Sequence, residues 1–391
     1  MALRTLADLD VEGKRVLLRV DFNTPMEDSR IVDDSRIRQS LPTFYDLLRR
    51  GAAIVVATHI DRPGGRVDPK LSVRPAADRL AQLLGVAVGV APDVCGPETR
   101  AAAHRLSRGG LLMLENVRFE PGEESNDPAF ARQLAAMADC YVNDAFGAAH
   151  RAHASTEGVA HLLPCAAGLL MQQEVEFLGR VLTEPQPPLI AIVGGAKISS
   201  KIGVIESLLP RVERLLLGGA MACTMLKAGG ASMGSSKVED DQIERARGLL
   251  AAGAGKLLLP VDAVIADDFV SDAATRVVDA DSIPDGWMML DIGPQTVDAF
   301  DAVIASAGTV VWNGPMGVYE MEPFRRGTEA VAQAMARSTA VSVVGGGDLA
   351  AALANLGLDQ AITHISTGGG ATLEFLEGRE LPGIAALEDT G

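Results

Sequence analysis

The sequence predicts an α/β protein made of two doubly wound parallel-sheet domains, separated by a cleft and joined by a hinge helix. Short apolar runs rich in Val, Ile and Leu alternate with helix-length segments along the whole chain. These runs are continuous rather than alternating, which is typical of strands covered on both faces. The chain has 391 residues, and a single core usually stops growing below roughly 300 residues. We therefore expect two cores.

The expected strands form one set in each half of the chain. The first half contains 15–20, 53–57, 111–114 and 140–142. The second half contains 189–193, 215–217, 256–259, 309–312, 341–344 and 362–365. Each set is long enough for a sheet of its own, because the intervening segments can supply the crossover helices that parallel strands require.

An amphipathic helix pattern followed by a proline-rich segment predicts the boundary between the two halves. Residues 171–182 place apolar side chains at helical spacing, and Pro-Gln-Pro-Pro at 185–188 ends the pattern. We therefore predict an N-terminal domain at 1–170, a hinge helix and linker at 171–188, and a C-terminal domain at 189–377. The remaining tail, 378–391, is expected to return to the N-terminal domain.

Composition limits the possible partners. The formal net charge is −16, and 48% of the residues are hydrophobic. The acidic balance opposes nucleic acid and anionic membranes, so an anionic ligand needs a local basic pocket. The sequence has no 18-residue apolar run and no basic, apolar leader, so we expect a soluble cytoplasmic protein. The four cysteines are scattered, which disfavours a disulfide framework or a zinc ribbon.

Two glycine clusters predict phosphate binding. Residues 345–347, followed by Asp348, and residues 368–370 each follow a β-branched apolar run and open a helical pattern. A helix start offers unpaired N–H groups and a positive dipole end, and Asp348 is expected at the N-cap. Glycines can also simply close tight turns in any α/β protein. Two clusters, one with an acid, favour a polyphosphate ligand.

The ends of the expected strands differ between the halves. In the first half they are polar and basic, at 21–23, 59–63, 116–119 and 143–153. In the second half they are rich in glycine, at 194–197, 218–220 and 313–315. Ligands of open parallel sheets bind beyond the carboxyl ends of the strands. One half therefore suits a small carboxylate or phosphate and the other a nucleotide, which indicates phosphoryl transfer between them.

Seven segments together resemble the phosphoglycerate kinase family, in the family's order and over nearly the whole chain. They are 19–25, 115–119, 144–153, 194–197, 311–315, 345–348 and 366–370. The resemblance implies reversible transfer from 1,3-bisphosphoglycerate to ADP, giving 3-phosphoglycerate and ATP in glycolysis or gluconeogenesis. It also implies Mg²⁺ as cofactor, a monomer, an N-terminal domain that binds phosphoglycerate and a C-terminal domain that binds nucleotide.

The resemblance assigns a substrate site to the first domain. It comprises Asp21, Phe22, Asn23, Arg36, His59, Arg62, Arg118 and Arg151. Asp21 and Asn23 correspond to residues that hold the glycerate hydroxyl and carboxylate. Arg36 also corresponds to the residue that meets the travelling phosphoryl group. Taken singly, each Arg is more often a solvated surface charge, and only the joint placement at strand ends supports a site.

The resemblance assigns a nucleotide site to the second domain. It comprises Gly195, Lys197, Lys201, Asn313, Pro315, Glu320, Gly346, Gly347, Asp348 and Leu349. Lys197 is expected at a helix start as the catalytic lysine, with Lys201 one turn later. Backbone N–H groups at Gly347 and Gly370 are expected to stabilise the phosphoryl group in flight, and Asp348 is the implied Mg²⁺ ligand. The implied reaction is an in-line transfer on closure of the cleft.

Three residues depart from the family pattern. Asp61 stands where the family usually has Gly and is expected to pair with a neighbouring Arg. Leu349 replaces a usual Thr or Ser that can bond a phosphate, so Leu349→Thr is expected to tighten nucleotide binding or raise turnover. Met289 replaces a common Gly and is expected to narrow the adenosine pocket.

Two other functions remain as alternatives. Gly345, Gly347 and Ala350 form a loose dinucleotide fingerprint, but the next strand does not end in the acid that an NAD-dependent dehydrogenase needs for its ribose. A non-catalytic two-lobed binding protein would also have a cleft, but it would show no turnover.

Overall fold

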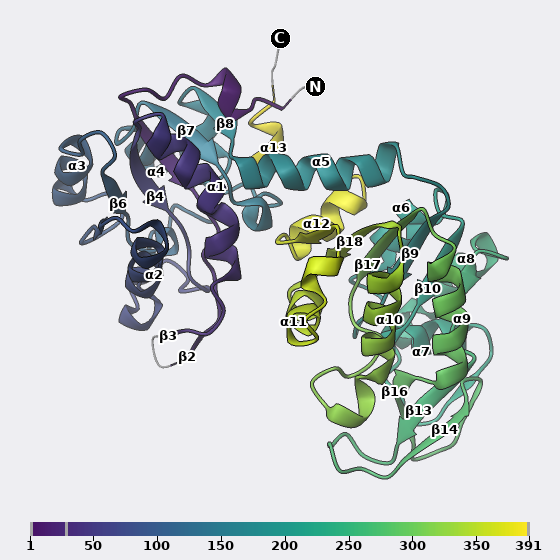
Figure 1. Ribbon diagram of the computed structural model, residues 1–391. Coiled ribbons are helices and arrows are strands. Elements are labelled where there is room, and N and C mark those ends of the chain that lie inside the picture. The colour runs from purple at the N-terminus through teal and green to yellow at the C-terminus, as the bar shows by residue number, and fades with distance from the viewer. Residues whose placement is uncertain (1–2, 28–29, 389–391) are drawn as a thin grey trace. The chain divides into compact units, whose positions relative to one another are not determined.

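The computed structural model describes residues 3–27 and 30–388. The chain divides into two compact units, and each is considered by itself (Figure 1). Unit 1 contains the described residues up to Glu176 and those from Glu380 onward, and unit 2 is Phe177–Arg379. The division falls inside helix α5 (Leu169–Thr183) and within the predicted linker 171–188.

Unit 1 is built on a six-stranded parallel sheet with the order β5-β6-β4-β1-β7-β8. Its strands are β1 (Arg15–Arg19), β4 (Ala53–Ala57), β5 (Val88–Val90), β6 (Leu111–Met113), β7 (Cys140–Asn143) and β8 (Cys165–Ala167). Its helices include α1 (Ser35–Arg49), α2 (Arg74–Leu84), α3 (Pro97–His104) and α4 (Pro128–Ala135). The four strands expected in this half are confirmed, and β5 and β8 are additional.

The C-terminal segment belongs to unit 1. The Gly383 N–H at helix α13 (Pro382–Ala385) donates to the Ala149 carbonyl at 2.9 Å, and the Arg4 N–H donates to the Leu387 carbonyl at 3.0 Å. Figure 1 shows α13, in yellow, beside the purple and teal elements of this unit. Residues far apart in the sequence therefore complete one folding unit, and residues 380–388 of the predicted tail belong to it, whereas 378–379 belong to unit 2.

Unit 2 contains a second six-stranded parallel sheet with the order β12-β10-β9-β17-β18-β19. Its strands are β9 (Leu189–Val193), β10 (Arg214–Leu217), β12 (Leu257–Leu258), β17 (Thr309–Asn313), β18 (Val341–Gly345) and β19 (His364–Ser366). Its helices are α6 (Ile202–Leu208), α7 (Gly219–Ala228), α8 (Ile243–Ala252), α9 (Pro294–Ala305), α10 (Arg326–Arg337), α11 (Gly347–Asn355) and α12 (Gly370–Leu376). All six strands expected in this half are confirmed, and with the sheet of unit 1 they confirm the doubly wound α/β fold class.

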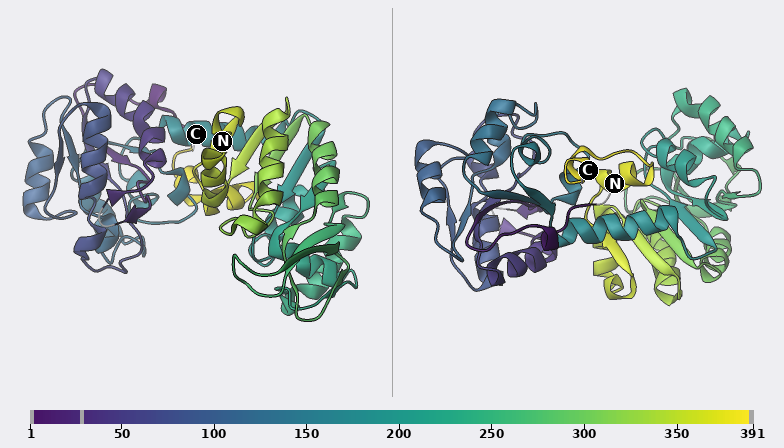
Figure 2. Two further views of the ribbon diagram at one scale, coloured as in Figure 1. Left: turned by 60° about the horizontal axis from the view of Figure 1, so that its bottom comes forward. Right: turned by 90° about the horizontal axis from the view of Figure 1, so that it is seen from above.

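Unit 2 also contains a small antiparallel sheet that was not expected from the sequence. It has the order β14-β13-β16, with β13 (Asp262–Ala266), β14 (Thr275–Asp279) and β16 (Met288–Ile292). This sheet lies at the end of unit 2 in Figure 1 and in the left view of Figure 2. Short two-stranded pairs also join β2 (Met26–Glu27) to β3 (Arg30–Ile31) and β11 (Ser232–Met233) to β15 (Ser282–Ile283).

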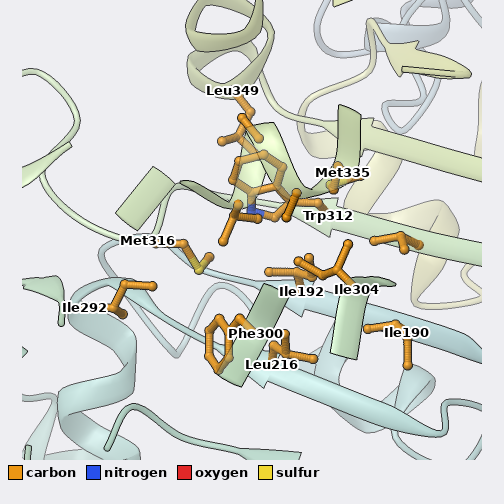
Figure 3. Close-up of a cluster of buried hydrophobic side chains, with 14 of the residues drawn as sticks. Ile190, Ile192, Leu216, Ile292, Phe300, Ile304, Trp312, Met316, Met335 and Leu349 are labelled. Atoms are coloured by element: carbon orange, nitrogen blue, oxygen red, sulfur yellow. The ribbon is translucent and has the colours of Figure 1, made fainter. Parts of the chain in front are cut away.

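The core of unit 2 corrects two expectations about the nucleotide site. Leu349 is fully buried in the main hydrophobic cluster, where it lies beside Trp312 (Figure 3). Met289 belongs to the same cluster and is 4% exposed. Both side chains pack in the core. The side chain at 349 therefore does not face a phosphate, and that of Met289 does not line an open adenosine pocket.

None of the helices in the described residues is both long enough and apolar enough to cross a membrane.

Candidate active site

The parallel strands of unit 1 bring the predicted substrate residues to one edge of the sheet. Arg19 at the end of β1 is in register with Ala57 of β4 and with Asn143 of β7. The loops that follow these strands, together with the loop after β6, therefore begin side by side. The chain moves outward from β1 to β5 and then returns to β7 on the other side, so the topological switch lies between β1 and β7.

Asp21 and Arg36 form an ion pair at this edge. Arg36 Nη1 lies 2.9 Å from Asp21 Oδ2, and Arg36 is the second residue of α1. Burial alone would raise the pKa of Asp21, but the positive charge of Arg36 and its neighbours outweighs it and lowers the pKa to about 2. The dipole at a helix start opposes a cation, so the ionised Asp21 offsets the unfavourable position of Arg36.

A buried arginine that the sequence analysis did not single out holds His59. Arg19 is fully buried, and its Nη2 lies 3.1 Å from His59 Nδ1. Burial lowers the pKa of His59 well below its usual range, so the ring is neutral at pH 7. Arginine can only donate, so His59 Nδ1 accepts and Nε2 carries the proton.

Glu123 is a second residue that the sequence analysis missed. It is fully buried, and it accepts hydrogen bonds from the N–H and the hydroxyl of Ser155, at 2.9 and 2.6 Å. The same hydroxyl accepts from Arg19 Nε at 2.7 Å, so Ser155 links the two buried charges. An arginine within an apolar strand, as in Leu17-Leu18-Arg19, is the signal that could have revealed this network.

The loop after β4 forms hydrogen bonds with the loop after β1 and with the loop after β6. The Asp61 N–H donates to Asn23 Oδ1 at 2.8 Å, and the Asp61 carbonyl accepts from Arg118 Nη1 at 2.7 Å. Asn116 Nδ2 donates to the Ile60 carbonyl at 2.7 Å. The structure thus brings Asn23 and Arg118 together through the backbone of residue 61.

Three other predicted substrate residues are placed differently. Phe22 is fully buried, stacks on Phe44 and donates its N–H to Thr58 Oγ1, so it serves packing in this structure. Arg62 is exposed and has no ion-pair partner within the described ranges. Arg151 is half-buried and donates from Nε to His150 Nε2 at 3.1 Å. The expected pairing of Asp61 with an arginine is wrong, because its carboxylate forms no ion pair with any described residue.

The switch point of unit 2 is made almost entirely of backbone. The chain passes from β9 outward to β12 and returns to β17, beside β9. The Gly195 N–H donates to the Pro315 carbonyl at 2.9 Å. A Cβ built on Gly194 would lie 2.2 Å from that carbonyl oxygen, and one on Gly314 would lie 2.3 Å from the Gly194 oxygen. Glycine is required there because the two loops cross with no room for a side chain.

Asn313 joins the predicted lysine to the glycine loop. Its Nδ2 donates to the Gly345 carbonyl at 2.9 Å, and its Oδ1 accepts a hydrogen bond from Lys201 Nζ. Burial lowers the pKa of Lys201 to about 8, although the nearby Asp348 acts in the opposite direction. The lysine is therefore held close to the start of α11 before any ligand arrives.

The expected helical setting of Lys197 is wrong. Helix α6 begins at Ile202 with Lys201 at its N-cap, and Lys197 lies in the preceding loop. Its side chain is exposed and has no ion-pair partner among the residues that the structure describes. The ammonium group is free to reach an anion. Pro315 is half-buried at the loop crossing, and Glu320 is exposed in a turn.

Both glycine clusters open helices as predicted, but Asp348 is not the N-cap. Gly346, with φ 115°, caps α11, and Gly369, with φ 50°, caps α12. No side chain caps either helix, and the N–H groups in the first turn of α11 have no partner among the described residues that would keep them from an anion. In α12 the Ala371 N–H already donates to the Gly368 carbonyl at 2.9 Å. A Cβ on Gly347 would meet no heavy atom within 4 Å, so packing does not require glycine there. Gly370 is the first residue of α12.

The residues of unit 2 fit Mg²⁺ only as a partner of phosphate. Asp348 is exposed in the first turn of α11. The structure holds no group of three or more His, Cys, Asp or Glu side chains able to hold a metal ion within residues 3–27 and 30–388. A single carboxylate suits a magnesium ion that keeps its waters and binds mainly through nucleotide phosphates.

Known proteins similar to this chain identify its family. A family model described as phosphoglycerate kinase matches residues 6–379. The chain belongs to the phosphoglycerate kinase family. A phosphoglycerate kinase of Moorella thermoacetica is 56% identical over the whole of both chains, and that of Rubrobacter xylanophilus is 54% identical over 100% of this chain and 99% of its own.

Solved structures of the family have the same fold. The phosphoglycerate kinase of Coxiella burnetii has a TM-score of 0.88 and 40% identity, covering 99% of each chain. That of Pyrococcus horikoshii has a TM-score of 0.89 and 34% identity, covering 98% of each chain. Membership of this family disfavours both alternatives, the dehydrogenase and the non-catalytic binding protein.

Proposed function

We propose that the chain catalyses the reversible transfer of a phosphoryl group from 1,3-bisphosphoglycerate to ADP, with phosphoglycerate bound on unit 1 and nucleotide on unit 2. The observation that carries this division of roles is the contrast between the two switch points. In unit 1 the switch point is lined by Asp21, Arg36 and His59, whereas in unit 2 it is lined by glycine backbone. Arginine guanidinium groups can bind the carboxylate and phosphate of a compact trianion bidentately. Unpaired N–H groups at helix N-termini suit the successive phosphates of a nucleotide.

The residues of unit 1 would bind and orient the glycerate. Asn23 has its Oδ1 occupied by the Asp61 N–H, so its Nδ2 is the group left to donate to a carboxylate. Arg118 is 4% exposed and keeps guanidinium N–H groups beyond the one that it gives to the Asp61 carbonyl. Arg62 and Arg151 would add positive charge around the distal phosphate.

The residues of unit 2 would hold the nucleotide and the phosphoryl group in flight. The N–H groups in the first turn of α11, which begins at Gly347, and the Gly370 N–H at the start of α12 would donate to phosphate oxygens. Lys197 and Lys201 supply positive charge. Asp348 would hold Mg²⁺, which when bound neutralises phosphate charge and fixes the phosphate geometry.

Direct transfer requires the two bound ligands to meet, and we propose α5 as the hinge that permits it. The Asp144 carboxylate accepts from the N–H groups of Leu170 and Met171, at 2.9 and 3.2 Å, and so anchors the start of α5 to unit 1. Exclusion of water would protect the acyl phosphate from hydrolysis. We further propose that the protein acts as a cytoplasmic monomer without nucleic acid or membrane partners.

A coupled assay tests the function. The purified protein with 3-phosphoglycerate, ATP and Mg²⁺ is expected to form ADP, and the rate should vanish when either substrate or the metal is omitted. ADP formation that does not depend on 3-phosphoglycerate would contradict the proposal, because it would indicate an ATPase rather than a transferase.

A further inference from the structure

Asp61 is one of two residues other than glycine that have positive φ among the described parts of the chain. Its φ is 50°, and the other is Asn126. Asp and Asn tolerate this left-handed conformation better than most side chains, but it still costs free energy relative to glycine. Strain of this kind persists only where the surroundings over-determine the backbone, and it clusters at functional sites.

The surroundings of Asp61 do fix its backbone. Its N–H is held by Asn23 Oδ1 at 2.8 Å and its carbonyl by Arg118 Nη1 at 2.7 Å. The preceding residue, Ile60, is 2% exposed, and its carbonyl accepts from Asn116 Nδ2. The peptide groups around residue 61 therefore brace two residues of the phosphoglycerate site that come from different loops.

The side chain of Asp61 has no such partner. It is exposed, and it forms no ion pair or hydrogen bond with any described residue. In the sequence it nevertheless lies between His59 and Arg62, in the loop after β4 that carries two of the predicted basic residues. Its negative charge is therefore not neutralised by the protein, and a bound trianion would be exposed to it.

We propose that Asp61 sets the affinity of the phosphoglycerate site in two ways, which rest on the proposed function. Its left-handed backbone fixes the orientation of Asn23 and Arg118, and its unpaired carboxylate weakens binding of the anionic substrate. A weaker site releases 3-phosphoglycerate faster, because affinity differences of this kind reside mainly in dissociation rates.

Three variants separate the two roles. Asp61→Asn removes the charge and keeps a side chain that tolerates positive φ, and Asp61→Gly removes the charge and the strain. Asp61→Ala removes the charge but places an unsuitable residue in the left-handed conformation. A matched control is Glu98→Gln, which makes the same charge change at an exposed residue in the first turn of α3.

Steady-state kinetics with 3-phosphoglycerate and ATP read out the result. We expect Asp61→Asn and Asp61→Gly to lower the KM for 3-phosphoglycerate by ~3-fold to ~10-fold at low ionic strength, and by less at 0.5 M salt, because exposed charges are screened. The KM for ATP should stay within about 2-fold. Asp61→Ala should have a KM for 3-phosphoglycerate at least ~3-fold above that of Asp61→Asn. Alanine is strained in the left-handed conformation, so the backbone at residue 61 would hold Asn23 and Arg118 less well.

The outcomes are distinguishable. Wild-type KM values in Asp61→Asn and Asp61→Gly, with an active wild-type enzyme, would overturn the charge role and leave the proposed function standing. Equal KM values for the Ala and Asn variants would contradict the claim that the left-handed backbone at residue 61 orients Asn23 and Arg118. An equal fall in KM in Glu98→Gln would overturn the specific role by showing a general charge effect. A wild-type enzyme without activity toward 3-phosphoglycerate would overturn both the inference and the proposed function.

Discussion

The two units carry the same kind of sheet, but the anion sites that we propose for them consist of different groups, side chains in unit 1 and backbone in unit 2. Unit 1 uses side chains whose charges are already paired, as in Arg36 with Asp21 and Arg118 with Glu124. Unit 2 uses backbone N–H groups at glycine-capped helix starts, with Lys197 left exposed and without an ion-pair partner among the described residues. Fixed amide dipoles need no counter-charge when the ligand is absent, whereas a cluster of guanidinium groups does.

Two buried carboxylates, one in each unit, show how much neighbouring cations matter. Asp21 lies among cations, and its pKa falls to about 2. Asp291 in β16 is buried and accepts hydrogen bonds from the N–H groups of Ile292 and Gly327, its two donors among residues 3–27 and 30–388, and burial raises its pKa to about 7. Two backbone donors do not offset the loss of water around Asp291, whereas the arginines around Asp21 do.

The largest effect should come from removing Arg36, the side chain expected to meet the phosphoryl group during transfer. We expect Arg36→Ala to lower kcat by ~10³-fold, in the range seen for arginines that stabilise phosphoryl transfer. The KM for ATP should change little, because Arg36 lies on unit 1. A matched control is Arg38→Ala, which removes an exposed arginine two residues along α1 that pairs with Asp34.

Near-normal kcat in Arg36→Ala would contradict its assignment to the transition state. Stopped-flow measurement of the phosphoryl-transfer step makes the test stricter, because it excludes product release as the limiting step.

The next effect concerns pH and Asp291. Its pKa rises from 3.8 in the unfolded chain to about 7 in the folded one. The folded state therefore binds more protons between these values, so the stability contributed by the neutral carboxyl is present below about 4 and lost as pH rises through about 7. The stability of Asp291→Asn relative to wild type should rise by about 3 kcal/mol between pH 5 and pH 8.

Tryptophan fluorescence can follow this change in unit 2 alone. Both tryptophans of the chain, Trp287 and Trp312, lie in unit 2. Denaturant unfolding at each pH gives the difference in free energy, and Asp298→Asn, at an exposed residue of α9, is the control. A difference that stays constant from pH 5 to pH 8 would show that Asp291 is ionised in the folded protein throughout.

A third effect separates packing from binding at position 349. The family pattern predicts that Leu349→Thr tightens nucleotide binding or raises turnover, but the side chain is fully buried in the core. We now expect a loss of about 3 kcal/mol of stability, from lost apolar contacts and a buried hydroxyl without a partner. The KM for ATP should be unchanged, and Leu349→Met should cost less than about 1.5 kcal/mol.

A stable Leu349→Thr variant with tighter nucleotide binding would restore the original expectation. The measurement pairs unfolding by fluorescence with the KM for ATP in the same preparation.

The smallest effect tests the backbone site itself. Gly347 begins α11, and an added Cβ there meets no protein atom. We expect Gly347→Ala to fold normally but to raise the KM for ATP by ~10-fold, because the methyl group obstructs the approach of phosphate to the N–H groups. The control is Gly248→Ala in α8, another exposed helical glycine with open space at its Cβ.

Unchanged nucleotide kinetics in Gly347→Ala would indicate that phosphate does not contact this turn. A large loss of stability would instead show that the glycine serves folding.

The strands that were predicted correctly are those whose own sequence carries the strand pattern. The central strands are continuous apolar runs, because both faces are covered, and all ten that were expected are present. Strand β5, with a glycine and half-exposed valines, and the antiparallel β14, which is largely exposed, have no such pattern. Their strand conformation depends on partners far away in the sequence, which a local pattern cannot show.

The candidate site was predicted in composition but not in detail. Residues named by motif were located at the expected strand ends, whereas helix starts were misplaced by a few residues at Lys197 and Asp348. The buried pair Arg19 and Glu123 escaped notice because a charged residue in a core is recognised only when its neighbours are known. The side-chain direction of Leu349 likewise depends on tertiary packing.

The most direct test of the division of labour is an NMR titration of ¹⁵N-labelled protein with each ligand separately. We predict that 3-phosphoglycerate shifts the arginine Nε–H signals and the amides of Asn23, Asp61 and Arg118, and that ADP shifts the amides of 346–349 and 368–371. Arginine signals of unit 1 that respond to ADP, or glycine-loop amides of unit 2 that respond to 3-phosphoglycerate alone, would contradict the account.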